Sequence, residues 1–179
     1  MKIKSLFLLF LSGCIIGTLL DALHVAVGIA YYTHPFFMGQ AWWVPLIFGA
    51  ATLLIGVSHY KLHPMPGSPP TAFLGSFVFF VLSYLITATL PVLSQINAFI
   101  LFVFYLISWS LFDRTLVSIV LALITAIIGC TVESSLGWIG QYHYTTPDFF
   151  RVPFWLPALY LNASATGGFL GRLFLGRKS

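Results

Sequence analysis

Six long apolar runs constrain this chain more than any other feature of its sequence. They cover residues 6–30, 42–57, 73–93, 96–112, 116–138 and 154–175. A helix needs about 20 residues to cross the hydrocarbon core of a membrane. Only 7% of the residues are charged, whereas soluble domains carry about 25%. We therefore expect an all-α membrane protein in which residues 1–179 form one domain, a compact bundle of six transmembrane helices.

The positions of the basic residues predict how this bundle lies in the membrane. If the chain crosses six times, seven of its eight lysines and arginines fall on one side. These seven are Lys2, Lys4, Lys61, Arg114, Arg172, Arg177 and Lys178, and Arg151 falls on the other side. Because basic loops stay in the cytoplasm, both termini are expected there. The membrane would be the inner membrane of a bacterium or the endoplasmic reticulum of a eukaryote, and no nucleic-acid partner is expected.

Three ionisable side chains lie inside the predicted spans, where a charge costs about 2.5–3.5 kcal/mol on insertion scales. They are Asp21 and His24 in the first span and Glu133 in the fifth. Each shares a helical face with small residues, which let helices approach closely in membranes. The first face holds Gly13, Gly17, Asp21, His24 and Gly28, and the second holds Ala122, Thr125, Gly129, Glu133 and Gly137.

We expect Asp21, His24 and Glu133 to converge in the outer half of the bundle. His24 and Glu133 lie at equal depth, which permits a direct pair, and Asp21 lies about one turn deeper. Two roles stay open for them. They could form a buried polar link between helices, or the polar base of a cavity that lipids can enter. The sixth span carries a further ridge of small residues, for which we expect helix packing. This ridge consists of Ala163, Gly167 and Gly171.

Five short strings are more specific than the composition. They are AWWVP at 41–45, WSLFDR at 109–114, GQYHYTTPDF at 140–149, WLP at 155–157 and GGFLGR at 167–172. In order and spacing these strings resemble the insulin-induced gene (Insig) family, from about residue 41 to residue 172. The sequence departs from the animal members at Ala158, where they carry a cysteine, and it lacks their long polar terminal extensions. The resemblance is therefore to a bacterial-type homologue.

The resemblance implies a six-helix bundle that binds lipid, carries no cofactor and is not an enzyme. Animal members bind oxysterols and retain the sterol-sensing proteins Scap and HMG-CoA reductase in the endoplasmic reticulum. Bacterial homologues are associated with a diacylglycerol-type lipid in a central cavity and with trimers. For this chain the resemblance implies a diacylglycerol-like or sterol-like lipid, a homo-oligomer and a membrane-protein partner. Asp148 is the residue that it implies for contact with such a partner.

Aromatic and polar residues near the span ends are further candidates for ligand contact. Trp42 and Trp43 open the second span, where indoles prefer the membrane interface, so they either anchor the helix or line the mouth of a ligand site. Gln141 and Tyr144 belong to a polar rim before the last span. Near them, Asp148 and Arg151 are spaced to pair on a short helix.

The remaining charged and histidine residues predict no metal site and no catalytic residue. At the cytoplasmic interface, Asp113 and Arg114 are expected to form a local ion pair. The pair His59 and His63 precedes Pro64 and is expected to form a loop rather than a metal site.

Three function classes can be compared on these residues. The first is a lipid sensor or scaffold, which needs apolar walls with a few placed polar groups. The second is an intramembrane enzyme that uses Asp21, His24 and Glu133 for acid–base chemistry on a lipid, although no established catalytic motif accompanies them. The third is a substrate-capture subunit of an importer, which would need a polar pocket open to the outer face. The family strings favour the first class.

Overall fold

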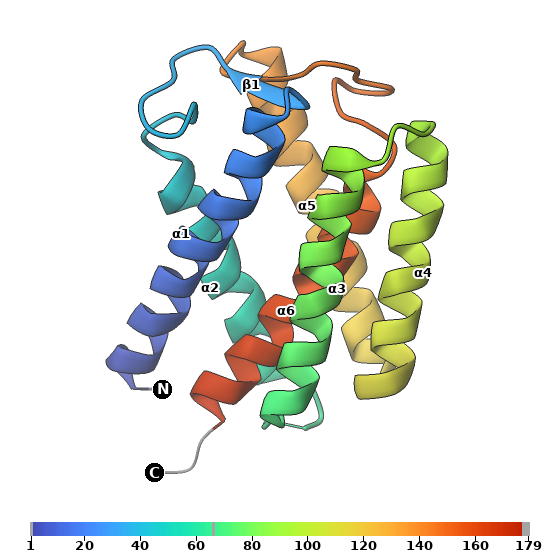
Figure 1. Ribbon diagram of the computed structural model, residues 1–179. Coiled ribbons are helices and arrows are strands. Elements are labelled where there is room, and N and C mark those ends of the chain that lie inside the picture. The colour runs from blue at the N-terminus through green and yellow to red at the C-terminus, as the bar shows by residue number, and fades with distance from the viewer. Residues whose placement is uncertain (1, 66, 177–179) are drawn as a thin grey trace.

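The computed structural model describes residues 2–65 and 67–176, and it contains six helices (Figure 1). These are α1 (Ile3–Ala26), α2 (Val44–Leu62), α3 (Pro70–Thr89), α4 (Ser94–Phe112), α5 (Leu116–Trp138) and α6 (Leu156–Leu175). Two short strands, β1 (Ala30–Tyr32) and β2 (Tyr142–Tyr144), pair beyond the helix ends. The expected all-α membrane bundle is confirmed.

Three helices end at different places from those expected. The third span was expected to reach residue 93, but α3 ends at Thr89, since Pro91 follows. The first span was expected to reach residue 30, but α1 stops at Ala26 because Gly28 adopts a positive φ of 77°, which ends the helix. The second span was expected to end at residue 57, but α2 continues to Leu62. This polar last turn remains helical because His59 is buried against the bundle, and Pro64 follows soon after.

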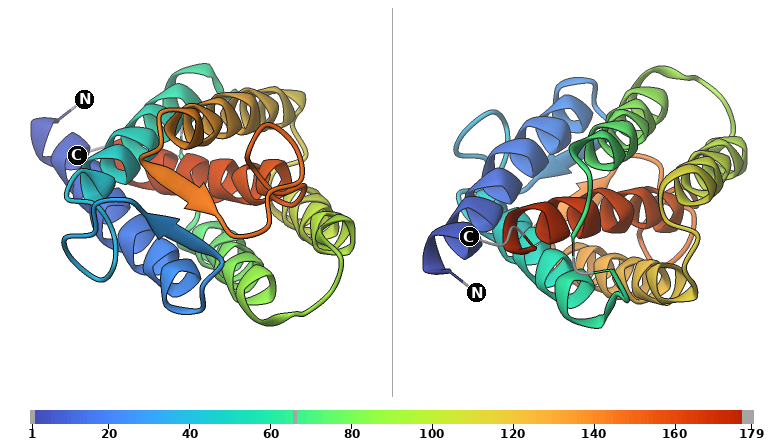
Figure 2. Two further views of the ribbon diagram at one scale, coloured as in Figure 1. Left: turned by 90° about the horizontal axis from the view of Figure 1, so that it is seen from above. Right: turned by 90° about the horizontal axis from the view of Figure 1, so that it is seen from below.

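Helix α6 runs through the centre of the bundle, with the other helices arranged around it (Figure 2). Helices α1 to α5 are long and apolar enough to cross a membrane, whereas α6 is not among them by composition. Its polar side chains face other helices instead of lipid. Asn162 in particular is 1% exposed and donates from Nδ2 to the backbone oxygens of Leu101 and Ala158, at 2.9 and 3.0 Å. A central helix therefore tolerates polar residues that a lipid-facing helix would not.

Small residues mark the places where helices approach most closely. A Cβ atom built on Gly13 or Gly17 would overlap Phe48 of α2, and one built on Gly171 of α6 would overlap the backbone of Gly56. The packing role expected for the ridge on the sixth span is thus confirmed at Gly171. Gly28 was expected on the same face as Gly13, but it lies past the end of α1 with open space around it.

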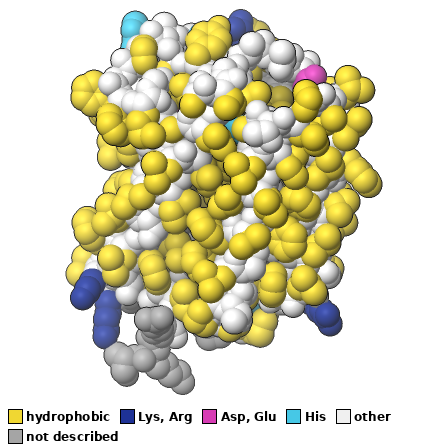
Figure 3. All heavy atoms as spheres, in the orientation of Figure 1, with side chains coloured by type: hydrophobic (Ala, Val, Ile, Leu, Met, Phe, Trp, Pro, Cys, Tyr) yellow, Lys and Arg dark blue, Asp and Glu magenta, His cyan; other side chains and the backbone are white. Residues whose placement is uncertain are grey.

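The start of α1 and the end of α6 lie at one end of the bundle, which we call the terminal end; the opposite end is the far end (Figure 1). On the face shown in Figure 3, lysine and arginine side chains appear near these two ends, and hydrophobic side chains cover the surface between them. Among described residues, Lys2, Lys61 and Arg114 adjoin the terminal end and Arg151 the far end. Arg177 and Lys178 lie outside the described residues. The chain is therefore a multi-pass integral membrane protein with an apolar belt.

The far end is closed by the antiparallel pairing of β1 with β2, which the sequence did not predict. The register pairs Ala30 with Tyr144 and Tyr32 with Tyr142. Strand alternation turns Tyr32, Tyr142 and Tyr144 into the bundle, while Tyr31 and His143 stack on the outer side with ring centroids 5.1 Å apart. This small sheet positions three tyrosines above the buried carboxyl groups.

Candidate functional site

Glu133 of α5 lies at the centre of a buried tyrosine cluster. Its Oε2 accepts a hydrogen bond from Tyr144 Oη and its Oε1 accepts one from Tyr160 Oη, each at 2.5 Å. Tyr160 comes from α6, and its ring fits against α5 because residue 129 is glycine: a Cβ there would overlap the ring. The small-residue face expected on the fifth span therefore creates the space in which Glu133 meets α6.

Asp21 of α1 forms a second buried cluster at the same end. Its Oδ2 accepts hydrogen bonds from Tyr32 Oη at 2.7 Å and from Gln40 Nε2 at 2.6 Å. Gln40 Nε2 also donates to the backbone oxygen of Thr18 at 3.0 Å. The contact between the Gln40 amide and the Asp21 carboxyl thus joins the loop between β1 and α2 to α1. Both residues are buried, with Gln40 2% and Asp21 5% exposed.

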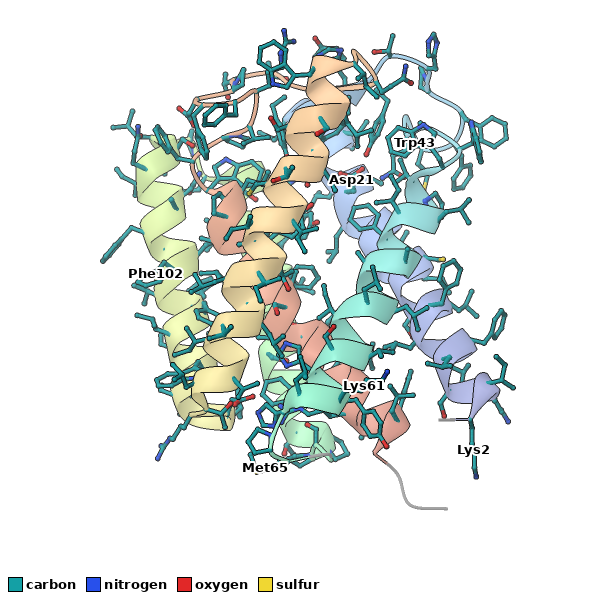
Figure 4. All side chains as sticks on the ribbon, turned by 180° about the vertical axis from the view of Figure 1, so that it is seen from behind. Lys2, Asp21, Trp43, Lys61, Met65 and Phe102 are labelled. Atoms are coloured by element: carbon teal, nitrogen blue, oxygen red, sulfur yellow. The ribbon has the colours of Figure 1, made fainter. Side chains whose placement is uncertain are left out.

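The two clusters line one cavity near the far end, which we call the carboxylate cavity. Besides Asp21 and Glu133, its walls consist of Tyr32, Trp43, Val44, Ile47, Phe48, Val132, Leu136, Tyr142 and Tyr160. It encloses about 370 Å³ of empty space, including the part open to the exterior. Figure 4 shows Asp21 and Trp43 near each other at the far end, between α5 and α2. Asp21 and Glu133, which were predicted to converge, therefore line one cavity.

A second cavity, which we call the apolar groove, lies between α1, α2, α3 and α6. Its lining is Ser12, Gly13, Ile16, Gly17, Phe48, Ala51, Thr52, Ile55, Phe73, Phe77, Phe80, Tyr84, Leu159, Tyr160, Ala163, Thr166, Gly167 and Leu170. It contains about 680 Å³ of empty space, again including its open part, and no charged residue lines it. Phe48 and Tyr160 line both cavities, so a layer of two aromatic rings separates the groove from the buried carboxyls.

His24 does not join the carboxyl groups, and its expected pairing with Glu133 is wrong. Its Nε2 is hydrogen-bonded to Thr87 Oγ1 of α3 at 2.9 Å, and its ring lies 4.8 Å from that of Tyr84. Equal depth in the membrane was the basis for expecting the pair. Depth does not fix the direction in which a side chain leaves its helix, and His24 points toward α3 while Asp21 points toward the carboxylate cavity.

The other candidate residues are divided between the cavity and the surface. Trp43 lines the carboxylate cavity and contacts the edge of Tyr32 with ring centroids 5.6 Å apart, but the adjacent Trp42 is 68% exposed. Gln141 makes backbone hydrogen bonds to Leu136 and Thr33, and its side chain lines neither cavity. Tyr144 acts on the site through its bond to Glu133.

Asp148 lies in the loop before α6 and does not form the expected pair with Arg151. Its Oδ2 accepts a hydrogen bond from the backbone nitrogen of Phe154 at 2.8 Å. Arg151 lies instead over the ring of Trp138, 4.4 Å from the ring centroid, and donates to the backbone oxygen of Gly137. The segment does not form the short helix on which the pairing depended; both Phe150 and Arg151 have positive φ.

Three residues that hold the site together were missed in the sequence: Tyr32, Gln40 and Tyr160. Tyr160 follows the small-residue pattern of its helix, so a helical projection could have shown it beside Gly129. Tyr32 and Gln40 lie in the connection between two spans, and no periodic pattern marks them. Only the strand pairing and the loop path bring them to Asp21.

Comparison with known proteins identifies the family. No protein-family model matches the chain. The insulin-induced gene 1 protein of Danio rerio is 26% identical over 180 residues, which cover 95% of this chain and 72% of that protein. That of Xenopus tropicalis is 24% identical over the same shares. The crystal structure of a mycobacterial Insig homologue from Mycobacterium vanbaalenii superposes with a TM-score of 0.91 and 25% identity, covering 99% of this chain and 97% of that one. The chain is an Insig homologue of the bacterial type.

Two of the strings that carry the Insig resemblance meet at the terminal end of this Insig homologue. Asp113, from WSLFDR, accepts a hydrogen bond at Oδ2 from Arg172 Nη2, from GGFLGR, at 2.9 Å. His63 Nε2 lies 2.9 Å from the other carboxyl oxygen of Asp113. The expected local pair with Arg114 is wrong: Arg114 adopts a positive φ and donates from Nε to the backbone oxygen of Ser110. The ion pair thus joins the α4–α5 turn to α6.

His59 and His63 of this Insig homologue are both buried in the bundle. His59 lies within α2, where its Nε2 is 3.2 Å from Ser164 Oγ of α6, and His63 caps the same helix. They were expected in a loop, which is wrong for His59. Among the described residues, no group of three or more histidine, cysteine, aspartate or glutamate side chains could hold a metal ion.

The terminal-end network predicts an acid-sensitive contribution to stability. Burial raises the pKa of Asp113. Hydrogen bonds from Thr115 and His63 and the nearby Arg172 guanidinium lower this pKa by more than burial raises it, so the pKa lies below its usual range. A carboxyl whose folded pKa is lowered stabilises the protein fully above its unfolded pKa, about 3.9, and that contribution disappears as the pH falls through the folded value.

We therefore expect the stability advantage of the wild type over Asp113→Asn to be constant above about pH 5 and to shrink below about pH 4. Thermal unfolding of both proteins in detergent across this pH range measures the difference in their stability. The other carboxyl groups are the same in both proteins, so their contributions cancel in this difference. An advantage that stays constant into strong acid would contradict the lowered pKa.

Proposed function

We propose that this Insig homologue binds a neutral lipid, diacylglycerol-like or sterol-like, in its helix bundle and acts as a lipid sensor or scaffold. The observation that carries this proposal is the apolar groove, which is lined by four helices and has no charged wall residue. Burying a charge against such walls is costly, so the groove favours an uncharged ligand. Its length, from Tyr84 near the far end to Phe73 near the terminal end, suits a long apolar molecule.

A few polar groups in the groove could orient the lipid. Thr166 of α6 lines the groove, and its Oγ1 is buried without a hydrogen-bond partner among the described residues. A hydroxyl or ester group of a lipid would satisfy it. At the far end Tyr160 presents a second polar group, whose orientation is held by Glu133. Apolar walls with one or two placed polar groups are typical of lipid sites.

The seven candidate ligand residues enter this proposal in different roles. Glu133 and Tyr144 would act by holding Tyr160, and His24 by joining α1 to α3 at the outer end of the groove. Asp21 and Trp43 line the carboxylate cavity behind the two aromatic rings. For Trp42 and Gln141 we propose only a place at the membrane interface, since neither lines a cavity.

Partner contacts and a non-enzymatic role form part of the same proposal. A mycobacterial homologue with a TM-score of 0.91 to this chain was solved as a cross-linked trimer, which supports homo-oligomerisation here. Asp148 lies in an exposed loop and would face a membrane-protein partner. The separation of His24 from Asp21 and Glu133 argues against a catalytic trio. We propose a bacterial inner membrane, with the terminal end in the cytoplasm.

Native mass spectrometry of the detergent-purified protein tests the lipid proposal. Ile16 lines the groove, whereas the adjacent Ile15 is 52% exposed on the outer face of α1. We expect Ile16→Trp to fill the groove and to reduce the lipid-bound fraction about fivefold or more, because overpacking excludes the ligand. Ile15→Trp makes the same chemical change toward the bilayer and should leave the lipid bound.

Thr166→Val supplies a second test that changes no volume. It should weaken retention of a lipid with a free hydroxyl more than retention of a fully apolar one, since only the former can use the lost hydroxyl. A protein purified without lipid, a bound water-soluble metabolite, or equal retention in the Ile15 and Ile16 variants would contradict the proposal.

A further inference from the structure

We propose that the carboxylate cavity is a second ligand site, separate from the apolar groove, that binds the ammonium group of an amphiphilic amine from the membrane. This inference does not depend on lipid binding in the groove. Two carboxyl groups line the cavity, that of the buried Asp21 and that of the half-buried Glu133. Their hydrogen-bond donors are tyrosine hydroxyls and the Gln40 amide, all of them neutral.

No basic side chain compensates these two carboxyl groups in the described part of the chain. No lysine, arginine or histidine lines the cavity, and both ion pairs of residues 2–65 and 67–176 involve Asp113 at the opposite end of the bundle. Buried carboxylates in proteins are normally paired or bound to a cation. A positively charged ligand would supply the missing partner.

Asp21 has an oxygen available for such a ligand. The side chain lines the cavity and the residue is only 5% exposed. Both of its hydrogen bonds end at Oδ2, and no donor among the described residues reaches Oδ1. Oδ1 is also not one of the fully buried atoms that lack a partner, so it is open to the cavity that the side chain lines. The ammonium group would lie against Oδ1, between Asp21 and Glu133.

The walls distinguish an organic cation from a metal ion. Trp43, Tyr32 and Tyr142 form a continuous aromatic surface, with ring centroids 5.6 Å apart for the first pair and 4.8 Å for the second. Aromatic faces beside carboxylates are the usual surroundings of bound ammonium groups. Calcium and magnesium need six or more oxygen ligands, but Val44 and Leu136 are part of this lining and supply none.

The opening of the cavity indicates where the amine comes from. Ile47 of α2 and Val132 of α5 both line the cavity and are 37% and 39% exposed on the apolar surface. The mouth therefore lies between α2 and α5 and faces the lipid of the far leaflet. A phospholipid headgroup would bring a phosphate without a basic residue to meet it, so we assign the site to an amine that carries an alkyl chain and no phosphate.

Isothermal titration calorimetry on the protein in maltoside micelles tests this site with two matched probe pairs. The membrane arm compares dodecyltrimethylammonium with dodecanol, and the soluble arm compares choline with its uncharged isostere, in which carbon replaces nitrogen. We expect each ammonium compound to bind more tightly than its neutral match by about tenfold or more. Dodecyltrimethylammonium should bind more tightly than choline. If dodecyltrimethylammonium and choline bound equally well, the ammonium site would be supported, but a membrane source of the amine would be refuted in favour of a soluble amine.

Two adjacent tryptophans provide the decisive variant pair. Trp43→Phe should weaken dodecyltrimethylammonium binding about threefold to tenfold, because phenylalanine has the weaker cation–π face, and Trp42→Phe should leave it unchanged. Asp21→Asn, which retains a hydrogen-bond acceptor, should weaken it about tenfold or more. Equal binding of charged and neutral probes, equal effects of the two tryptophan variants, or displacement by calcium chloride would overturn the proposal.

Discussion

Replacing Asp113 with alanine is expected to lower the free energy of unfolding by about 3–5 kcal/mol. The Arg172 side chain is 2% exposed and that of Asp113 is 5% exposed, with Nη2 and Oδ2 2.9 Å apart. Alanine would leave the guanidinium buried with His63 as its nearest polar neighbour. Removing one partner of a buried ion pair costs far more than the pair contributes, because the remaining charge is desolvated and uncompensated.

Unfolding in mixed micelles of detergent and dodecyl sulfate measures this change, and Asp148→Ala is its matched control. Asp148 is an exposed aspartate with one hydrogen bond to the backbone, so its replacement should cost about 1 kcal/mol or less. The double variant Asp113→Ala with Arg172→Leu removes both charges, and its loss should be clearly smaller than the sum of the two single losses. If the two single losses of unfolding free energy added up to that of the double variant, the ion pair would contribute nothing to the stability of the protein.

Gly171→Ala is expected to destabilise the bundle by about 1–3 kcal/mol, although alanine is intrinsically the better helix former. A Cβ on residue 171 would overlap the backbone of Gly56, and one on Gly56 would lie 3.0 Å from Gly171 Cα. The obstacle to a Cβ on residue 171 is backbone, which cannot rotate away as a side chain can, whereas a Cβ on residue 56 would also overlap the Leu9 side chain. Helices α2 and α6 would have to separate, and the contacts that depend on their close approach would weaken with them.

Gly67→Ala is the corresponding control, since a Cβ there has open space within 4 Å. Its effect on thermal unfolding should be within about 0.5 kcal/mol. Gly56→Ala should resemble Gly171→Ala, because it enters the same contact from the other helix. If Gly171→Ala stabilised the protein, the helix propensity of alanine would outweigh the clash, and the close contact of α2 with α6 would be refuted.

Several elements of the fold followed from composition and spacing alone. Hydropathy located the fifth span at residues 116–138, the bounds of α5, and the small residues beside Glu133 indicated a packing face that the contact of Gly129 with Tyr160 bears out. The end of the second span was the least accurate boundary, because the polar residues around His59 have low hydropathy. Their burial against α6 keeps them helical.

The candidate site was only partly accessible from the sequence. Asp21 and Glu133 could be predicted to converge because intramembrane carboxyls avoid the lipid face, and because both were expected beyond the middle of their spans on the same side of the membrane. His24 obeys the same rule, but its partner is Thr87 of α3, and nothing in the sequence selects that partner over Glu133. Likewise, Arg114 is adjacent to Asp113 in the sequence and is the more obvious partner for it. Only the geometry of the α4–α5 turn directs Arg114 away and lets Arg172 pair with Asp113.

The sequence by itself determined the membrane environment, the six helices and the family resemblance, and it predicted which end of the bundle faces the cytoplasm. Hydropathy and charge act on each segment separately, through its transfer between water and lipid. The tertiary structure alone decided which polar side chains meet. That choice depends on the rotation of each helix and on contacts between distant segments, such as that of Thr145 with Gly28, 117 residues apart. The carboxylate cavity exists because such a contact pairs β1 with β2 and turns their tyrosines inward.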